Sequence, residues 1–143
     1  MRAESGYPSA MIFSEKDHQV FQALGARLFP RDSRFSVSGA DVVFAPAIER
    51  YFAEVSPTLT NNIKRALFAF NRGAHLSRLT HRAFTNLEPT EQDEYIRAWA
   101  ESSFYPRRVL FTALKMILTM VYTSHPEVER AIGYRPAGPR PAI

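Results

Sequence analysis

The sequence predicts an all-α fold, a single small bundle of about five helices. Apolar residues recur at helical spacing in five segments, and no segment shows the sustained apolar–polar alternation typical of a strand. Helix-start signals, a capping hydroxyl or a Pro, stand at or near the beginning of these segments. The chain has 143 residues and 45% apolar content, enough for a core without disulfides. We expect an N-terminal arm over 1–13, a helical core over 14–134 and an extended Pro-rich tail over 135–143.

The first three helices are expected between residues 14 and 73. Ser14 is expected to cap the first, which ends before Pro30. The second lies within 41–55, where Pro46 marks either its first turn or a kink. Ser56 is expected to cap the third, which weakens near Gly73. The expected buried faces are Val20, Phe21, Leu24, Leu28 and Phe29; Ile48, Tyr51, Phe52 and Val55; and Leu59, Ile63, Ala66, Leu67 and Phe70.

The region 75–100 contains the next helix. Phe84 and Leu87 are expected to enter the core from a short turn or helix. Thr90 is expected to cap a helix whose buried face consists of Tyr95, Ile96 and Trp99.

The last long helix is expected to open at Pro106. It is apolar on most sides through Tyr122, a pattern typical of a helix at the centre of a bundle. A short final turn over 126–132 is expected to end at Gly133.

Composition excludes several classes of function. The chain has no Cys, so disulfides, zinc–thiolate sites, iron–sulfur clusters and thiol catalysis are ruled out. The net charge is +4, but the Arg residues are scattered along the chain, which argues against nucleic-acid binding. The longest apolar stretch, 109–122, is shorter than the roughly 20 residues that span a bilayer. The first residues show no export signal, so we expect a cytoplasmic protein or one associated with the inner membrane face.

The residues suited to chemistry are few and dispersed. Glu15 and His18 stand three apart, half of a di-iron carboxylate motif, but no second pair has this spacing. No Gly-rich phosphate loop or nucleophile elbow is present. We therefore expect no catalytic, cofactor-binding or metal-binding residues. A stand-alone enzyme that assembles His75, His81 or His125 with distant acids is an open alternative.

Several residues at helix ends are suited to binding. Arg107 and Arg108 follow Pro106 in a first turn, where the helix dipole disfavours cations. They are either a solvated pair or are compensated by an acidic partner. Tyr134 follows Gly133 and is either a clamp on the last helix or an interface anchor. The expected partner interface comprises Arg107, Arg108, Tyr134, Arg135 and Pro136. The apolar helix over 109–122 supports a different function, binding of a small ligand or lipid.

Short motifs between residues 13 and 136 carry a family resemblance. They are Leu28-Phe29-Pro30, Phe84 and Leu87 before Pro89-Thr-Glu-Gln-Asp93, Trp99, Arg107-Arg108-x-Leu110-Phe111-x-Ala-Leu114-Lys115, Tyr122-x-x-x-Pro126, and Ile132-Gly133-Tyr134-x-Pro136. With these motifs the chain resembles the gluconate 2-dehydrogenase subunit 3 family.

The resemblance implies a role in a complex. Members of that family are small helical subunits that accompany a large flavin dehydrogenase or oxidase of the glucose–methanol–choline type. They assist maturation of the large subunit and do not carry the flavin, so the resemblance implies FAD in the partner and no cofactor in this chain. Many members have a twin-arginine signal, which this sequence does not show before Phe13. The implied function is a non-catalytic small subunit of an FAD-dependent alcohol or sugar oxidoreductase.

Overall fold

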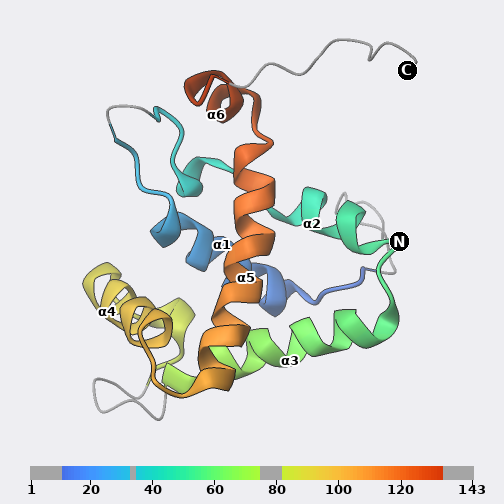
Figure 1. The fold of residues 1–143 in the computed structure, drawn as a ribbon, viewed down its shortest axis with the longest axis vertical. Helices are drawn as coiled ribbons and strands as arrows, with labels where there is room; N and C mark the ends of the chain where they lie inside the picture. The colour runs from blue at the N-terminus through green and yellow to red at the C-terminus, as the bar shows by residue number, and fades with distance from the viewer. Residues whose placement is uncertain (1–10, 33–34, 75–81, 134–143) are drawn as a thin grey trace.

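All regular structure in the described part of the chain is helical (Figure 1). The computed structural model describes residues 11–32, 35–74 and 82–133. The α-helices are α1 (Glu15–Leu28), α2 (Ala45–Phe52), α3 (Pro57–Gly73), α4 (Pro89–Ala100), α5 (Tyr105–Thr123) and α6 (Pro126–Ala131), and the short 3-10 helices are η2 (Gly39–Asp41) and η4 (Phe84–Asn86). The predicted all-α class is confirmed, and α6 is the short final turn that the sequence predicted.

Local capping chemistry sets most helix starts where the sequence predicted them. The Ser14 Oγ accepts a hydrogen bond from the Asp17 amide at 3.1 Å, and the Asp17 carboxylate accepts one from the Ser14 amide. The Ser56 Oγ accepts a bond from the Leu59 amide at 3.3 Å. Pro46 lies in the first turn of α2, which decides between the two interpretations of that residue.

The expected cap of α4 was wrong. The helix begins at Pro89, and Glu88 takes the capping position instead of Thr90. Pro fits the first turn of a helix because its missing N–H would have no partner there. The Glu88 amide donates a hydrogen bond to the Glu91 carboxylate at 3.0 Å, which ties the new start to the first turn.

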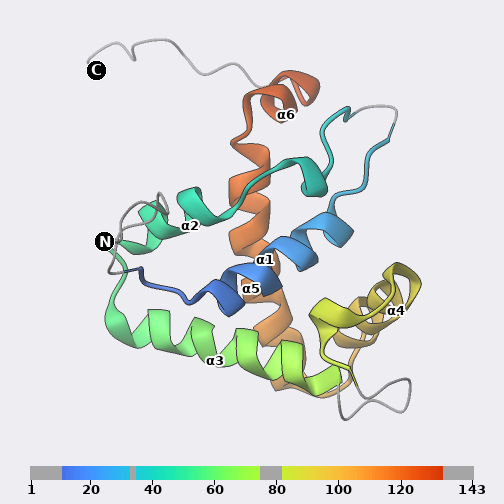
Figure 2. The same cartoon turned by 180° about the vertical axis from the view of Figure 1, so that it is seen from behind.

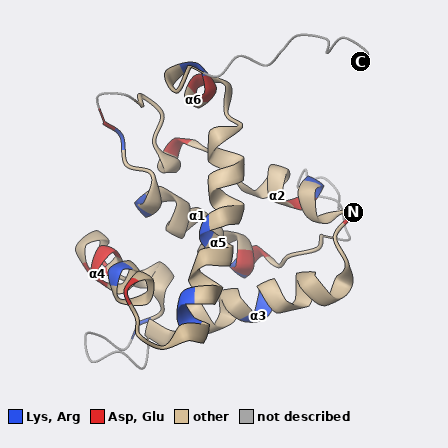
Figure 3. Cartoon of the chain, viewed as in Figure 1, with Lys and Arg blue, Asp and Glu red and all other residues tan. Residues whose placement is uncertain are grey.

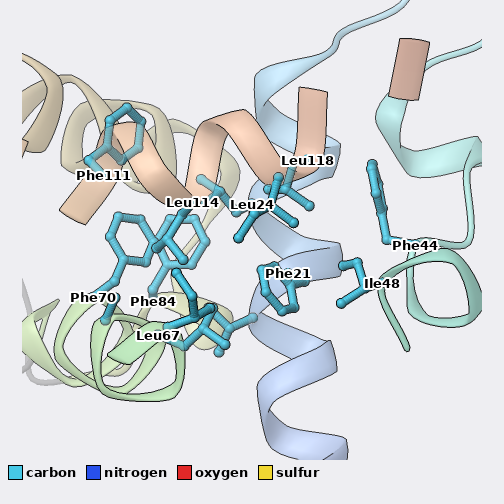
Figure 4. Close-up of a cluster of buried hydrophobic side chains, with 14 of the residues drawn as sticks. Phe21, Leu24, Phe44, Ile48, Leu67, Phe70, Phe84, Phe111, Leu114 and Leu118 are labelled. Carbon is cyan, nitrogen blue, oxygen red and sulfur yellow. The ribbon is translucent and has the colours of Figure 1, made fainter. Parts of the chain in front are cut away.

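Helix α5 lies at the centre of the arrangement and contacts α1, α2, α3, α4 and α6. In Figure 1 it runs vertically in front, and in Figure 2, from behind, α1 crosses in front of it. One contiguous apolar core fills the space between these helices (Figure 4). Its fully buried members include Phe21 and Leu24 of α1, Leu67 and Phe70 of α3, Phe84 of η4, and Leu114 and Leu118 of α5. The predicted entry of Phe84 and Leu87 into the core is confirmed.

Two predicted core positions, Tyr51 and Leu59, are exposed. On α2 the buried stripe passes through Ile48 and Phe52, and on α3 it begins at Thr60 and continues through Ile63. Each residue turns a helix by about 100°, so a neighbour of the stripe points away from the core. Leu28, Phe29, Val55 and Ile96 are half-buried.

A close backbone contact joins η2 to the end of α1. The Gly39 amide donates a hydrogen bond to the Phe29 carbonyl oxygen at 2.6 Å, and a Cβ on Gly39 would collide with the Gly25 carbonyl. Phe29 in turn stacks on Tyr122 of α5 with ring centroids 4.2 Å apart. The end of α1 and the start of η2 are thereby joined to each other and, through Phe29, packed against α5.

Candidate functional site

The connection between α4 and α5 positions the two predicted arginines. The Ser102 Oγ accepts a hydrogen bond from the Phe104 amide at 3.1 Å. The Phe104 carbonyl accepts from the amides of Arg107 and Arg108 at 3.1 and 3.4 Å, which starts the helix. Both side chains are exposed in the first turn of α5, as the sequence predicted.

Both guanidinium groups lie over aromatic rings. The Cζ of Arg107 is 5.3 Å from the centroid of Trp99, and the Cζ of Arg108 is 5.6 Å from that of Tyr105. Such contacts contribute about 0.5–1 kcal/mol at exposed sites, enough to offset an unfavourable helix dipole. Within the described ranges neither guanidinium forms an ion pair with a carboxylate. The two arginines are therefore an exposed, solvated pair, one of the two expected alternatives, and each also lies over an aromatic ring. Compensation by an acidic partner stays a prediction.

The ring under Arg107 belongs to the core, as predicted for Trp99. It packs edge-on against Phe70 at 5.1 Å, next to Tyr95, whose hydroxyl donates a hydrogen bond to the Phe70 carbonyl at 2.6 Å. Burial raises the pKa of Tyr95 to about 12, although contact with Trp99 and the charge of Arg107 oppose this rise. The arginine thus lies on a rigid aromatic base.

An apolar stripe runs along the uncovered side of α5. We call it the α5 outer face and define it as Tyr105, Arg108, Val109, Thr112, Met116 and Met120. The exposed fractions of its large apolar side chains are 68% for Tyr105, 44% for Val109, 62% for Met116 and 43% for Met120. An open hollow lies along this face, bordered also by Ala100 and Ala113. Figure 1 shows this helix foremost, with no other described helix in front of it.

The opposite side of α5 is core, so the helix is central to the bundle, as its apolar pattern predicted, but it keeps one exposed side. Phe111, Leu114, Ile117, Leu118 and Tyr122 are buried, whereas the outer face is not. Sequence reasoning missed the outer-face residues apart from Arg108. One signal in the sequence could have indicated this face: the helix has more apolar residues than a single buried face can hold. Met116 and Met120, one turn apart, are two of the extra ones.

Charge on α5 is of one sign. The helix carries Arg107, Arg108 and Lys115 and no acidic residue (Figure 3). The outer face therefore combines apolar surface with basic groups at one end and along its edge.

The remaining predicted interface residues, Tyr134, Arg135 and Pro136, lie outside the described residues, and so do His75 and His81. The Nδ1 of His125 accepts a hydrogen bond from the Glu127 amide at 3.2 Å and caps α6. Gly133 follows α6 with a φ of +80°, consistent with its predicted place at the helix end.

Glu15 and His18, which form half of a di-iron carboxylate motif in the sequence, have different surroundings in the structure. The Nε2 of His18 lies 2.7 Å from the Oε2 of Glu49 on α2, while Glu15 is exposed. Sequence reasoning missed Glu49 because it is 31 residues away. Among the described residues, no group of three or more side chains has the placement to hold a metal ion.

Glu49 also holds the segment before α1. Its carboxylate accepts hydrogen bonds from the amides of Ile12 and Phe13 at 2.9 and 3.0 Å, and Phe13 is fully buried. Burial raises the pKa of Glu49, but these two bonds and the His18 contact outweigh it and leave the pKa below its ordinary value. The end of the predicted arm is therefore irregular, as expected, yet part of the core.

The described helices include none with the length and apolar content required to cross a bilayer. The expected cytoplasmic or inner-face location stays a prediction.

Comparison with known proteins identifies a family. The family model described as gluconate 2-dehydrogenase subunit 3 matches residues 15–141, a range that contains all six α-helices. No curated protein and no solved structure matches the chain.

Proposed function

The chain belongs to the gluconate 2-dehydrogenase subunit 3 family, and from this premise we propose that it is the non-catalytic small subunit of an FAD-dependent oxidoreductase complex. Membership supports an auxiliary role beside a larger dehydrogenase. The proposal adds that the large subunit is of the glucose–methanol–choline type, holds the FAD and oxidises an alcohol or sugar. The family match over residues 15–141 is the observation that carries it.

We further propose that the small subunit stabilises the large one and assists its maturation. A partner that binds only the folded form of a protein raises its apparent stability by mass action. A small bundle with a continuous apolar core and α5 at its centre is suited to this role, because it presents a preformed surface. Arg107, Arg108, Tyr134, Arg135 and Pro136 stay the predicted contact residues.

Co-expression tests this function. The tagged small subunit is produced with the large dehydrogenase subunit of the same source, and the large subunit is also produced alone. We expect the two chains to co-elute, all the FAD to be in the large subunit, and the yield of soluble, flavin-loaded large subunit to fall without its partner. A large subunit that is equally soluble, loaded and active alone, with no co-elution, would contradict the proposal.

The alternative function, binding of a small apolar ligand or lipid, is tested in the same preparation. Native mass spectrometry of the isolated small subunit would reveal a retained ligand as extra mass. Such a mass in a chain that binds no dehydrogenase would support the alternative and reject the subunit role.

A further inference from the structure

We propose that the α5 outer face is the surface that binds the large dehydrogenase subunit, and that the partner presents apolar groups there with a carboxylate opposite Arg108. This inference rests on the proposed function and assigns the place of contact.

Exposure of apolar side chains is the first argument. Tyr105, Val109, Met116 and Met120 follow one another along one side of the helix, each more than two-fifths exposed. From Tyr105 to Met120 the helix rises about 22 Å, a length that suits an interface of standard size. Methionine is flexible and polarisable, so it adapts to an apolar partner surface.

The second argument is that the rest of the fold holds α5 rigidly. The same helix is packed against α1, α2, α3, α4 and α6, and its inner side chains Leu114 and Leu118 are fully buried. At its N-terminal end Tyr105 supports the guanidinium of Arg108. A preorganised surface loses little conformational entropy on binding, which favours affinity.

Charge decides the kind of partner. Arg107, Arg108 and Lys115 are the charged residues of α5, and all three are basic. A second copy of this chain would bring like charges together across an antiparallel contact, with Lys115 near the middle of the helix close to its counterpart. A different protein with carboxylates at the rim satisfies Arg108 by a charge-assisted hydrogen bond.

Matched substitutions on two faces provide the test. Met116→Glu places a charge in the outer face. Phe68→Glu on α3 is the control, because Phe68 is 64% exposed against 62% for Met116 and lies in a separate hollow with Lys16 and Asn86. We expect Met116→Glu to weaken binding of the purified large subunit about tenfold or more, and Phe68→Glu to leave it within about twofold. Both variants should unfold at the wild-type thermal midpoint, which would confirm that they are folded.

A chemical footprint gives a second readout that does not depend on a disruptive side chain. The chain has no Cys, so Thr112→Cys introduces a single thiol on the outer face. Thr58→Cys introduces one at the start of α3, away from α5 in Figures 1 and 2. We expect the complex to slow alkylation of the thiol at 112 about tenfold and to leave the thiol at 58 nearly unchanged.

The outcomes separate this inference from the function on which it rests. If the wild-type chain forms no complex with the large subunit, both are overturned. If it forms the complex while Met116→Glu binds normally and the thiol at 112 stays reactive, only the assigned surface is wrong. Protection of that thiol by self-association, or by anionic phosphatidylglycerol vesicles and not by the large subunit, would also overturn it.

Discussion

The inner and outer faces of α5 both carry large apolar side chains but have opposite surroundings. Leu114 and Leu118 on the inner face are inaccessible to solvent, whereas Met116 and Met120 on the outer face are exposed. Both faces carry branched and aromatic side chains, with Val109 and Tyr105 on the outer face, but the two flexible thioethers of α5 lie on the outer face alone. The difference teaches that hydrophobicity along a helix does not separate a buried face from an exposed one, although the methionines of α5 lie only on its exposed face. Five predictions compare buried contacts of the fold with the outer face, from the largest expected effect on stability to the smallest.

Truncation of the inner face is expected to have the largest effect. Leu118→Ala removes a fully buried side chain and leaves a cavity, which should lower the free energy of unfolding by about 2–5 kcal/mol. Denaturant unfolding followed by circular dichroism measures this change, with Met120→Ala on the outer face as its control. Equal losses in the two variants would contradict the distinction between the faces.

Loss of the Glu49 carboxylate is expected to have the next largest effect. Glu49→Gln removes the charge of the carboxylate, which accepts hydrogen bonds from two backbone amides and contacts His18. The free energy of unfolding should fall by about 1–3 kcal/mol. Glu54→Gln is the matched control, since Glu54 is exposed just beyond the end of α2. Denaturant unfolding near neutral pH compares both variants with the wild type. Equal stability of Glu49→Gln and the wild type would show that the carboxylate contributes nothing.

The same carboxylate also predicts the pH dependence. The folded-state pKa of Glu49 is lowered, so its stabilisation is present above the unfolded-state pKa of about 4.3 and is lost as the pH falls through the folded value. Thermal midpoints of wild type and Glu49→Gln, measured from pH 7 down to pH 3, should therefore converge.

Removal of the Tyr122 hydroxyl, at the C-terminal end of the inner face, should have a moderate effect on stability. The Tyr122 hydroxyl donates a hydrogen bond to the Val37 carbonyl at 2.7 Å, and its ring stacks on Phe29. Tyr122→Phe keeps the stack and loses the bond, so the free energy of unfolding should fall by about 0.5–1.5 kcal/mol. Burial raises the pKa of this hydroxyl and also that of Tyr95, so the ultraviolet titration of Tyr122→Phe should lose one of the wild type's tyrosines with a raised pKa and keep that of Tyr95.

Truncation of the outer face should have the smallest effect on stability. Met116→Ala removes an exposed side chain, so the free energy of unfolding should change by no more than about 0.5 kcal/mol. Chemical denaturation of the isolated chain measures this. A loss comparable with that of Leu118→Ala would show that Met116 contributes to the fold itself.

Short-range signals accounted for most of the helices. The Ser14 and Ser56 caps, Pro46 in a first turn and Gly133 beyond the last helix are all interactions or conformations set within a few residues. Thr90 failed as a cap because Pro89, next to it, competes for the same helix start.

Long-range contacts could not be predicted in the same way. Glu49 meets His18 across 31 residues, and Tyr122 meets Val37 across 85. A sequence pattern identifies an apolar face but not the element that covers it, so Tyr51 and Leu59 were expected in the core although both are exposed. The exposed position of Met116 and Met120 was missed for the same reason.

By itself the sequence determined an all-helical chain, the positions of most helix ends and the family to which the chain belongs, because these depend on neighbouring residues and on motifs. Only the tertiary structure decided which side of α5 is core, which rings support Arg107 and Arg108, and which carboxylate holds the segment before α1. These outcomes depend on how helices distant in the chain pack, since packing leaves one face of an apolar helix against its neighbours and the other exposed.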